Sequence, residues 1–169
     1  MKLVHYYSGI LERLHSVTES CSDKVLLQLM KRPEKAYKRF QNYEWYIANR
    51  KATETWIYEQ FEAKGGNPQT RYPRYFVLGE NRYLASGFGE EWNKVVIELE
   101  NVDEKDVSFT LDDSMKLHVS GMARVVLTKE ELIRYAIEKR GSLEAFVKEK
   151  ESRNEYVEAQ IWNPKYWEK

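Results

Sequence analysis

The spacing of apolar residues makes the first third of the chain mainly helical. Apolar positions three and four residues apart predict a helix over residues 9–19 and a longer helical segment over residues 24–64. Pro33 is expected to interrupt that segment, because proline disfavours helical backbone at the residue before it. Residues 34–64 are expected to form one or two helices, with at most a slight break near Asn49. Gly65 begins the stop signal, since glycine readily adopts the left-handed conformation that closes a helix.

Short extended runs rich in β-branched and aromatic residues predict strands elsewhere. They cover residues 2–7, 74–78, 94–99 and 107–111, with a further edge expected from Val119 and residues 123–127. Thr128 and Glu131 have the spacing of a capping box, which predicts helices over 129–139 and 143–150. A last run, 155–162, alternates apolar and polar residues in the manner of a strand.

This order of elements predicts an α+β fold with a central, mostly antiparallel sheet. An N-terminal helical segment precedes the central strands, and two C-terminal helices precede the last strand. The 169 residues suit a single domain, 1–169, in which the segment 24–64 is either one wall of the core or an inserted arm.

Composition narrows the classes of function. The 27 basic and 27 acidic residues balance, which excludes a polybasic protein but leaves a local basic face open. The single cysteine excludes a disulfide framework and a multi-cysteine metal centre. No apolar run approaches the roughly 20 residues that cross a bilayer, so we expect no membrane partner and a cytoplasmic protein. The aromatic share of 14% suggests a pocket or a stacking surface.

His5 stands on the first predicted strand beside Tyr6 and Tyr7, directly before a helix start. A neutral imidazole at that place can bind a ribose hydroxyl while a tyrosine stacks on a flat ring. The alternative is a packed strand histidine bonded to a backbone carbonyl.

Glu158 lies in the middle of the last predicted strand, where it shares one face with Tyr156, Gln160 and Trp162. The opposite face is apolar and is expected to be the buried one. A carboxylate, an amide and aromatic walls are typical of a cleft floor. The alternative is an ordinary exposed strand face.

Residues 31–51 include seven basic and two acidic residues, interleaved with aromatic ones. This combination suits a nucleic-acid strand, because cations pair with phosphates and rings stack on bases. DNA or RNA is therefore a candidate partner, through Lys31, Arg32, Lys35, Lys38 and Arg39. The alternative is a solvated helix whose aromatic stripe belongs to the core.

Arg74 is a separate basic candidate, placed where a loop enters a predicted strand. Its guanidinium suits a pyrophosphate, because arginine can donate two parallel hydrogen bonds to two phosphate oxygens. The alternative is an ion pair with an acid such as Glu80 or Asp103.

Together these features resemble the ADP-ribosyltransferase fold, and within it the DNA-targeting ADP-ribosyltransferase toxins. The resemblance rests on HYYS at residues 5–8, on the meander of central strands, and on YVEAQI at residues 156–161, with its central acid. It implies NAD as the substrate, with a nucleic acid or a protein as acceptor. It also implies roles for single residues: a ribose contact for His5, nicotinamide stacking for Tyr6, Tyr7 or Tyr75, and transition-state stabilisation by Glu158 as catalytic acid. No arginine stands out by spacing as the family's arginine.

Two other hypotheses remain open. Glu158 and Gln160 match a Glu-x-Gln variant of a nuclease half-motif, which needs magnesium and a second acid such as Asp112 or Asp113. Those acids lie about 45 positions earlier, with two helices between, and no metal site is predicted. The other hypothesis is a non-catalytic binding module of phage or mobile-element origin that uses the basic segment.

Overall fold

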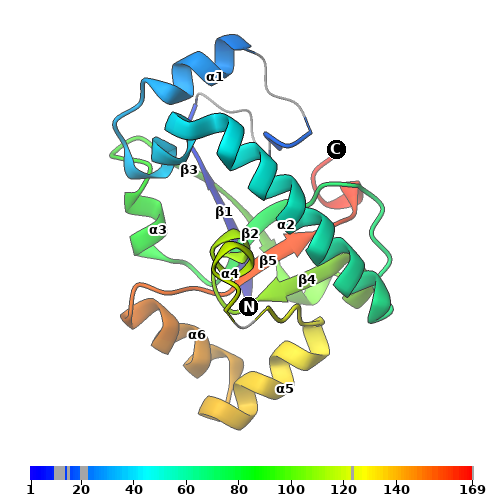
Figure 1. Ribbon diagram of the computed structural model, residues 1–169. Coiled ribbons are helices and arrows are strands. Elements are labelled where there is room, and N and C mark those ends of the chain that lie inside the picture. The colour runs from blue at the N-terminus through cyan, green and yellow to red at the C-terminus, as the bar shows by residue number, and fades with distance from the viewer. Residues whose placement is uncertain (10–13, 15, 20–22, 123, 169) are drawn as a thin grey trace.

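The computed structural model describes residues 1–9, 14, 16–19, 23–122 and 124–168 (Figure 1). Five strands form one antiparallel sheet in the order β3-β1-β2-β5-β4. The strands are β1 (Lys2–Tyr7), β2 (Arg74–Leu78), β3 (Asn93–Glu98), β4 (Val107–Thr110) and β5 (Glu158–Ile161). Helices stand on both sides of this sheet, which confirms the predicted α+β class with a central antiparallel sheet.

Most of the helices precede or follow the central strands, as expected. The α-helices of the described ranges are α1 (Asp23–Met30), α2 (Tyr43–Ala63), α3 (Arg82–Ser86), α4 (Ser114–Ser120), α5 (Lys129–Arg140) and α6 (Leu143–Ser152). Short 3₁₀ helices are η1 (Lys35–Asn42), η2 (Leu99–Asn101), η3 (Glu104–Asp106) and η4 (Pro164–Tyr166). No helix in these ranges is long and apolar enough to cross a membrane.

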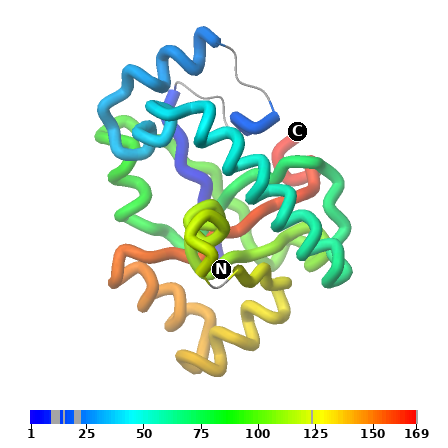
Figure 2. Tube along the Cα trace, viewed as in Figure 1, coloured from blue at the N-terminus to red at the C-terminus, as the bar shows by residue number. Residues whose placement is uncertain are grey.

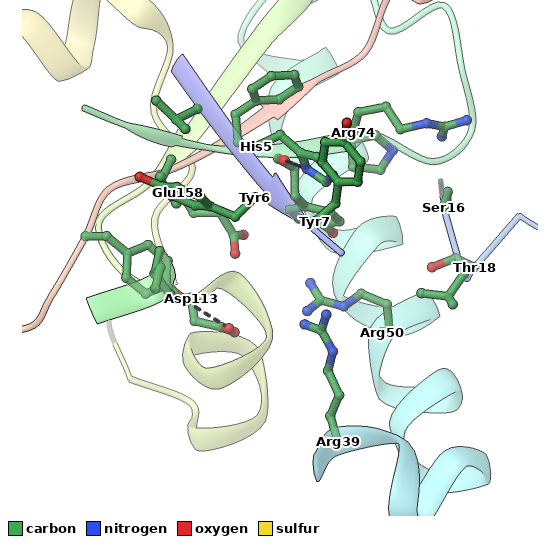
Figure 3. A pocket seen from close by; sticks show the side chains of 18 of the residues that line it. His5, Tyr6, Tyr7, Ser16, Thr18, Arg39, Arg50, Arg74, Asp113 and Glu158 are labelled. Atoms are coloured by element: carbon green, nitrogen blue, oxygen red, sulfur yellow. Dashed lines mark hydrogen bonds between the residues drawn. The ribbon is translucent and has the colours of Figure 1, made fainter. Parts of the chain in front are cut away.

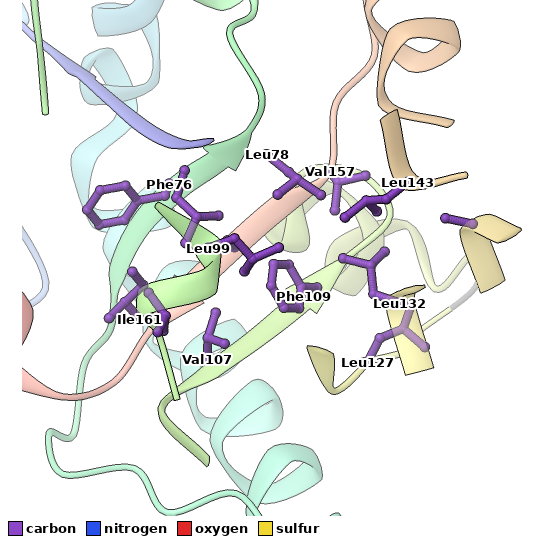
Figure 4. Close-up of a cluster of buried hydrophobic side chains, with 14 of the residues drawn as sticks. Phe76, Leu78, Leu99, Val107, Phe109, Leu127, Leu132, Leu143, Val157 and Ile161 are labelled. Carbon is purple, nitrogen blue, oxygen red and sulfur yellow. The ribbon is translucent and has the colours of Figure 1, made fainter. Parts of the chain in front are cut away.

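One face of the sheet packs on α5 and α6 (Figure 4). Phe76, Phe109 and Ile161 from three strands meet Leu132 of α5 and Phe146 of α6 in the largest apolar cluster. Local signals place these two helices. The capping box at the start of α5 is formed as predicted, and the glycine between the helices has φ 79°, a left-handed conformation that suits glycine.

The opposite face of the sheet packs on α2, which runs diagonally across it in Figures 1 and 2. Ile57 and Phe61 of α2 contact Trp162, which follows β5. A second cluster, around Tyr37 and Phe40 of η1, lies beside α2. The helical segment thus covers the sheet face on which Glu158 stands.

Several predicted boundaries are wrong in detail. As expected, α1 ends before Pro33, and α2 continues through Asn49 without more than the slight break that was allowed there. Between them the chain forms the 3₁₀ helix η1, where an α-helix was expected. Residues 16–19 form a turn and not the end of a helix, while 10–13 and 15 lie outside the described residues. Val119 was predicted to belong to a further edge, but it lies in α4. At the rest of that edge, the described residues of 123–127 supply one isolated bridge, between Leu127 and Phe109.

A split in the sheet separates the end of β1 from β2. β1 pairs with β3 over its whole length but with β2 only at Leu3 and Val4. Beyond these residues β1 and β2 part, so the end of β1 and the start of β2 flank an opening in the sheet.

Candidate active site

A cavity of about 180 Å³ lies at this opening (Figure 3). Its walls come from β1, β2, β5, α2 and the start of α4. All six residues that the sequence singled out for catalysis or cofactor binding line it: His5, Tyr6, Tyr7, Arg74, Tyr75 and Glu158. The cavity therefore brings together two ends of the chain that the sequence could only propose to be neighbours.

The six residues do not stand on one face of the sheet. Successive strand side chains point to opposite faces, so His5 and Tyr7 project on the same side as Leu3. Glu158 and Tyr75 project on the opposite side, towards α2, since Tyr75 pairs with Gln160 across the two strands. They reach a common cavity because β1 and β2 part at this point.

Glu158 is held by a chain of buried hydrogen bonds. Its Oε1 accepts from the Ser114 backbone N–H (3.3 Å) and from Gln160 Nε2 (3.1 Å). Behind Gln160, Ser108 Oγ donates to Gln160 Oε1 (2.8 Å), and Trp162 Nε1 donates to Ser108 Oγ (2.9 Å). Glu158 is only 6% exposed, so the alternative of an ordinary exposed strand face is wrong.

The charge state of Glu158 is finely balanced. Burial, and after it the nearby Asp113 carboxylate, raise the pKa of its carboxyl from the ordinary value to about 7. Arg50 opposes this rise, as do the hydrogen bonds from Ser114 and Gln160. Near neutral pH the group can therefore either hold or release a proton.

Asp113 is the ionised partner of Glu158. It caps α4, because its Oδ1 accepts from the Lys116 N–H (2.9 Å), and its Oδ2 accepts from the Tyr156 hydroxyl (3.1 Å). Burial alone would raise the pKa of Asp113, but Arg50 and these two donors together hold that pKa below its ordinary value. Two neighbouring carboxyl groups thus differ in protonation, as in many acid–base sites.

Arg50 and Glu54 of α2 line the cavity, although the sequence patterns marked neither of them as a site residue. Arg50 is 6% exposed, and its guanidinium lies over the ring of Tyr75 (4.7 Å) and near that of Tyr46 (5.7 Å). Its Nη1 lies 3.5 Å from Ser114 Oγ. Within the described residues, its Nε has no hydrogen-bond partner, and no carboxylate oxygen lies within 4 Å of its guanidinium nitrogens. Figure 3 shows this guanidinium and that of Arg39 pointing into the cavity, across from Asp113 and Glu158.

A signal for Arg50 was present in the sequence. Tyr46, Arg50, Ile57 and Phe61 recur at helical spacing, and all four are buried. An arginine on the apolar stripe of a helix is unusual, because arginine is almost never buried without a partner. The other six basic residues of the segment 31–51 made Arg50 look like one more surface cation.

His5 donates from Nδ1 to the backbone carbonyl of Tyr75 (2.7 Å). Burial lowers the pKa of His5 to about 4, so the ring is neutral at physiological pH and Nε2 is left as an acceptor. The carbonyl bond that the alternative expected is thus present, and it spans the split between β1 and β2. The ring also lines the cavity and stacks on Tyr7 (6.1 Å between centroids).

The other two aromatic candidates are engaged by neighbours. Tyr6 accepts from the Asn81 backbone N–H (2.9 Å) and packs edge-on against Trp92. Tyr75 donates to Glu54 Oε1 (3.0 Å) and carries Arg50 over its ring. Tyr7 is the remaining candidate for stacking on a ligand, and its own ring stacks on that of His5.

Arg74 forms an ion pair with Glu19 (2.7 Å). The alternative of an ion pair is thus present, but its partner is neither Glu80 nor Asp103. Its guanidinium lies over the ring of Trp167 (4.9 Å). The buried Nε and Nη1 of Arg74 have no hydrogen-bond partner within the described ranges. These two donors are therefore left unsatisfied in the free protein.

A wider outer chamber, of about 700 Å³, adjoins the inner cavity and shares Arg39, Arg50, Asp113 and Tyr156 with it. Lys35, Lys116, Trp45 and Tyr83 also line the outer chamber, and Trp45 is 50% exposed. Of the predicted nucleic-acid residues, Lys35 and Arg39 line this chamber. Arg32 turns to Glu34 instead, and Lys31 and Lys38 are exposed outside its walls.

The aromatic residues interleaved with these cations are divided between core and surface. Tyr37, Phe40 and Tyr46 are buried in one cluster, as the structural alternative expected. Trp45 is exposed, and it is the member of the group that stands beside the cations of the outer chamber.

Across the described residues, no group of three or more His, Cys, Asp or Glu side chains is arranged to hold a metal ion. No protein-family model matches the chain, and comparisons with curated proteins and with solved structures find no match either.

Proposed function

We propose that the chain is an ADP-ribosyltransferase that uses NAD as its substrate and modifies a nucleic acid or a protein. The observation that carries this proposal is the meeting of Glu158, Arg50 and His5 in one cavity at the split of the sheet. A carboxylate that titrates near neutrality stands there opposite a buried guanidinium that lacks a carboxylate partner.

The reaction needs a negative group beside the sugar. When the bond between the ribose carbon and the nicotinamide nitrogen breaks, its electron pair leaves with nicotinamide and positive charge develops on the ribose. The Glu158 carboxylate favours that transition state over the ground state. The acceptor's nucleophile then bonds to the same carbon, and its proton passes to Glu158, whose pKa near 7 suits a general base.

The basic groups of the cavity suit a diphosphate. Arg74 has two buried donors without partners within the described residues. Unpaired buried donors are unfavourable in the free protein, so an anion that accepts from them gains affinity. The neutral Nε2 of His5 is an acceptor of the kind that a ribose hydroxyl requires.

The outer chamber suits the acceptor. Lys35, Arg39 and Lys116 supply positive charge along it, and Trp45 offers an exposed ring. Cations with a stacking aromatic favour a single nucleic-acid strand. This supports DNA or RNA over protein as the acceptor.

The test is transfer of label from NAD to single-stranded DNA, RNA or lysate protein. Wild type is compared with Glu158→Gln and with the matched control Glu155→Gln, whose carboxylate pairs with Lys150 outside the cavity. We expect the rate of label transfer to fall at least about 100-fold in Glu158→Gln and to stay at the wild-type level in the control. Transfer that survives in Glu158→Gln contradicts the proposal.

The alternative of a binding module predicts a different result. Nucleic acid would then bind with a strong dependence on salt, and binding would fall in Lys35→Gln and Arg39→Gln, with no NAD consumed. A magnesium-dependent nuclease is not proposed, because Arg50 and Arg39 place positive charge beside Asp113 and Glu158, where the metal would have to lie.

A further inference from the structure

Two buried polar atoms on α2 lack a hydrogen-bond partner within the described part of the chain. They are Nε of Arg50, a donor, and Oε2 of Glu54, an acceptor. The two side chains are 6% and 1% exposed, and both line the inner cavity. A buried polar atom that stays unpaired destabilises the free protein, so each atom is a place where a ligand can add a bond.

The two residues are one helical turn apart and carry opposite charges. Such a pair usually meets on the helix surface, but no guanidinium nitrogen of Arg50 lies within 4 Å of a Glu54 carboxylate oxygen. Other contacts separate them. Arg50 lies over Tyr75 and reaches towards Ser114, while Glu54 Oε1 accepts from Thr18 (3.2 Å) and Tyr75 (3.0 Å).

A group that fits both atoms must accept from Arg50 and donate to Glu54. A primary carboxamide does both, because its oxygen accepts and its NH₂ donates. A carboxylate lacks the donor, and an ester or ketone lacks it too. The size of the cavity agrees, since a cavity of about 150 Å³ holds benzene and the inner cavity measures about 180 Å³.

We propose that Arg50 and Glu54 together recognise the carboxamide of a nicotinamide ring, with Arg50 Nε donating to its oxygen and Glu54 Oε2 accepting from its NH₂. Glu54 is then the residue that selects the amide over the corresponding acid. This inference rests on the proposed function for its ligand, and the two unpaired atoms that it uses both belong to α2.

The test compares the affinities of nicotinamide and nicotinic acid, free and within the intact dinucleotides, by calorimetry. Burial raises the pKa of Glu54, so the measurement is made at pH 8, where the carboxylate form is favoured. In wild type we expect the amide to bind about tenfold or more tightly than the acid, the effect of one hydrogen bond lost and one like charge added.

Glu54→Gln should remove the preference, to within about twofold, or invert it, because a glutamine NH₂ donates to the acid's carboxylate. The matched control is Glu59→Gln, an exposed carboxylate on the same helix, and it should keep the wild-type preference. The comparison in wild type needs no variant, so it holds even where Glu54→Gln fails to fold.

The outcomes separate this inference from the proposed function. An amide preference without any consumption of NAD supports the Arg50–Glu54 site and contradicts the transferase. Label transfer from NAD with equal affinity for amide and acid, or an unchanged preference in Glu54→Gln, overturns the assignment of Glu54 and leaves the transferase standing. Binding of neither compound in either form overturns the inference.

Discussion

Gln160 donates its side-chain amide to Oε1 of Glu158 across 3.1 Å, and the two residues stand on the same face of β5. Gln160 is fully buried and is itself held by Ser108, which accepts from Trp162. The carboxylate therefore has a fixed position before any ligand arrives. Such preorganisation is the main way in which a protein stabilises developing charge.

Ser108→Ala should destabilise the fold by about 1–3 kcal/mol, because it leaves the Trp162 N–H and the Gln160 Oε1 buried and unpaired. Urea unfolding measures the change. Ser86→Ala is the matched control: that hydroxyl is exposed and donates only to the Tyr83 carbonyl, so its loss should cost less than about 0.5 kcal/mol. Equal effects of the two changes would show that the buried chain does not stabilise the fold.

The pKa of Glu158 should move in opposite directions in two variants. Asp113→Asn removes a negative neighbour and should lower this pKa from about 7, whereas Arg50→Met removes a positive one and should raise it. Carbon NMR of the glutamate carboxyl groups follows the titration without relying on activity. Asp112→Asn, at the adjacent position, should change it least; shifts of the same sign in the first two variants would contradict this electrostatic account.

Glu158→Gln should be more stable than wild type at high pH. The pKa of Glu158 is about 7 in the folded chain against 4.5 as its ordinary value, so its contribution to stability is full below pH 4.5 and is lost as pH rises through 7. Glutamine does not ionise. The variant should therefore match wild type near pH 5 and exceed it at pH 8.5 by an amount on the order of 2 kcal/mol. Thermal unfolding at both pH values measures this, and parallel pH profiles would argue against a buried ionisation.

His5 should make the fold sensitive to acid. Its pKa is about 4 in the folded chain against an ordinary 6.5, so its contribution to stability is present above pH 6.5 and is lost as pH falls towards 4. His5→Gln keeps a donor for the Tyr75 carbonyl but does not ionise. The difference in melting temperature between the variant and wild type, measured at pH 7.5 and 4.5, should favour the variant more at the lower pH. An unchanged difference would place His5 in solvent.

Patterns among neighbouring residues were enough to predict most of the strands and longer helices. The capping box at Thr128, the strand at 74–78 and the helix end before Pro33 depend on neighbouring residues in the chain, and all three are present. The 3₁₀ turns of η1 were not predicted, because their apolar residues also fit an α-helix. The choice between the two is made by packing: Tyr37 and Phe40 are turned into a cluster with Leu29 and Met115.

Patterns along the chain predicted the α+β class and nominated His5 and Glu158, because both lie in short runs that are typical of strands. Tertiary structure alone decided that they share a cavity, because this depends on β1 parting from β2 after Val4. It also placed Arg50, Glu54 and Asp113 there, from a helix and a turn far away in the chain. Their proposed roles depend on burial and on the charges of groups that are distant in the sequence. Both depend on the packing of α2 across the sheet.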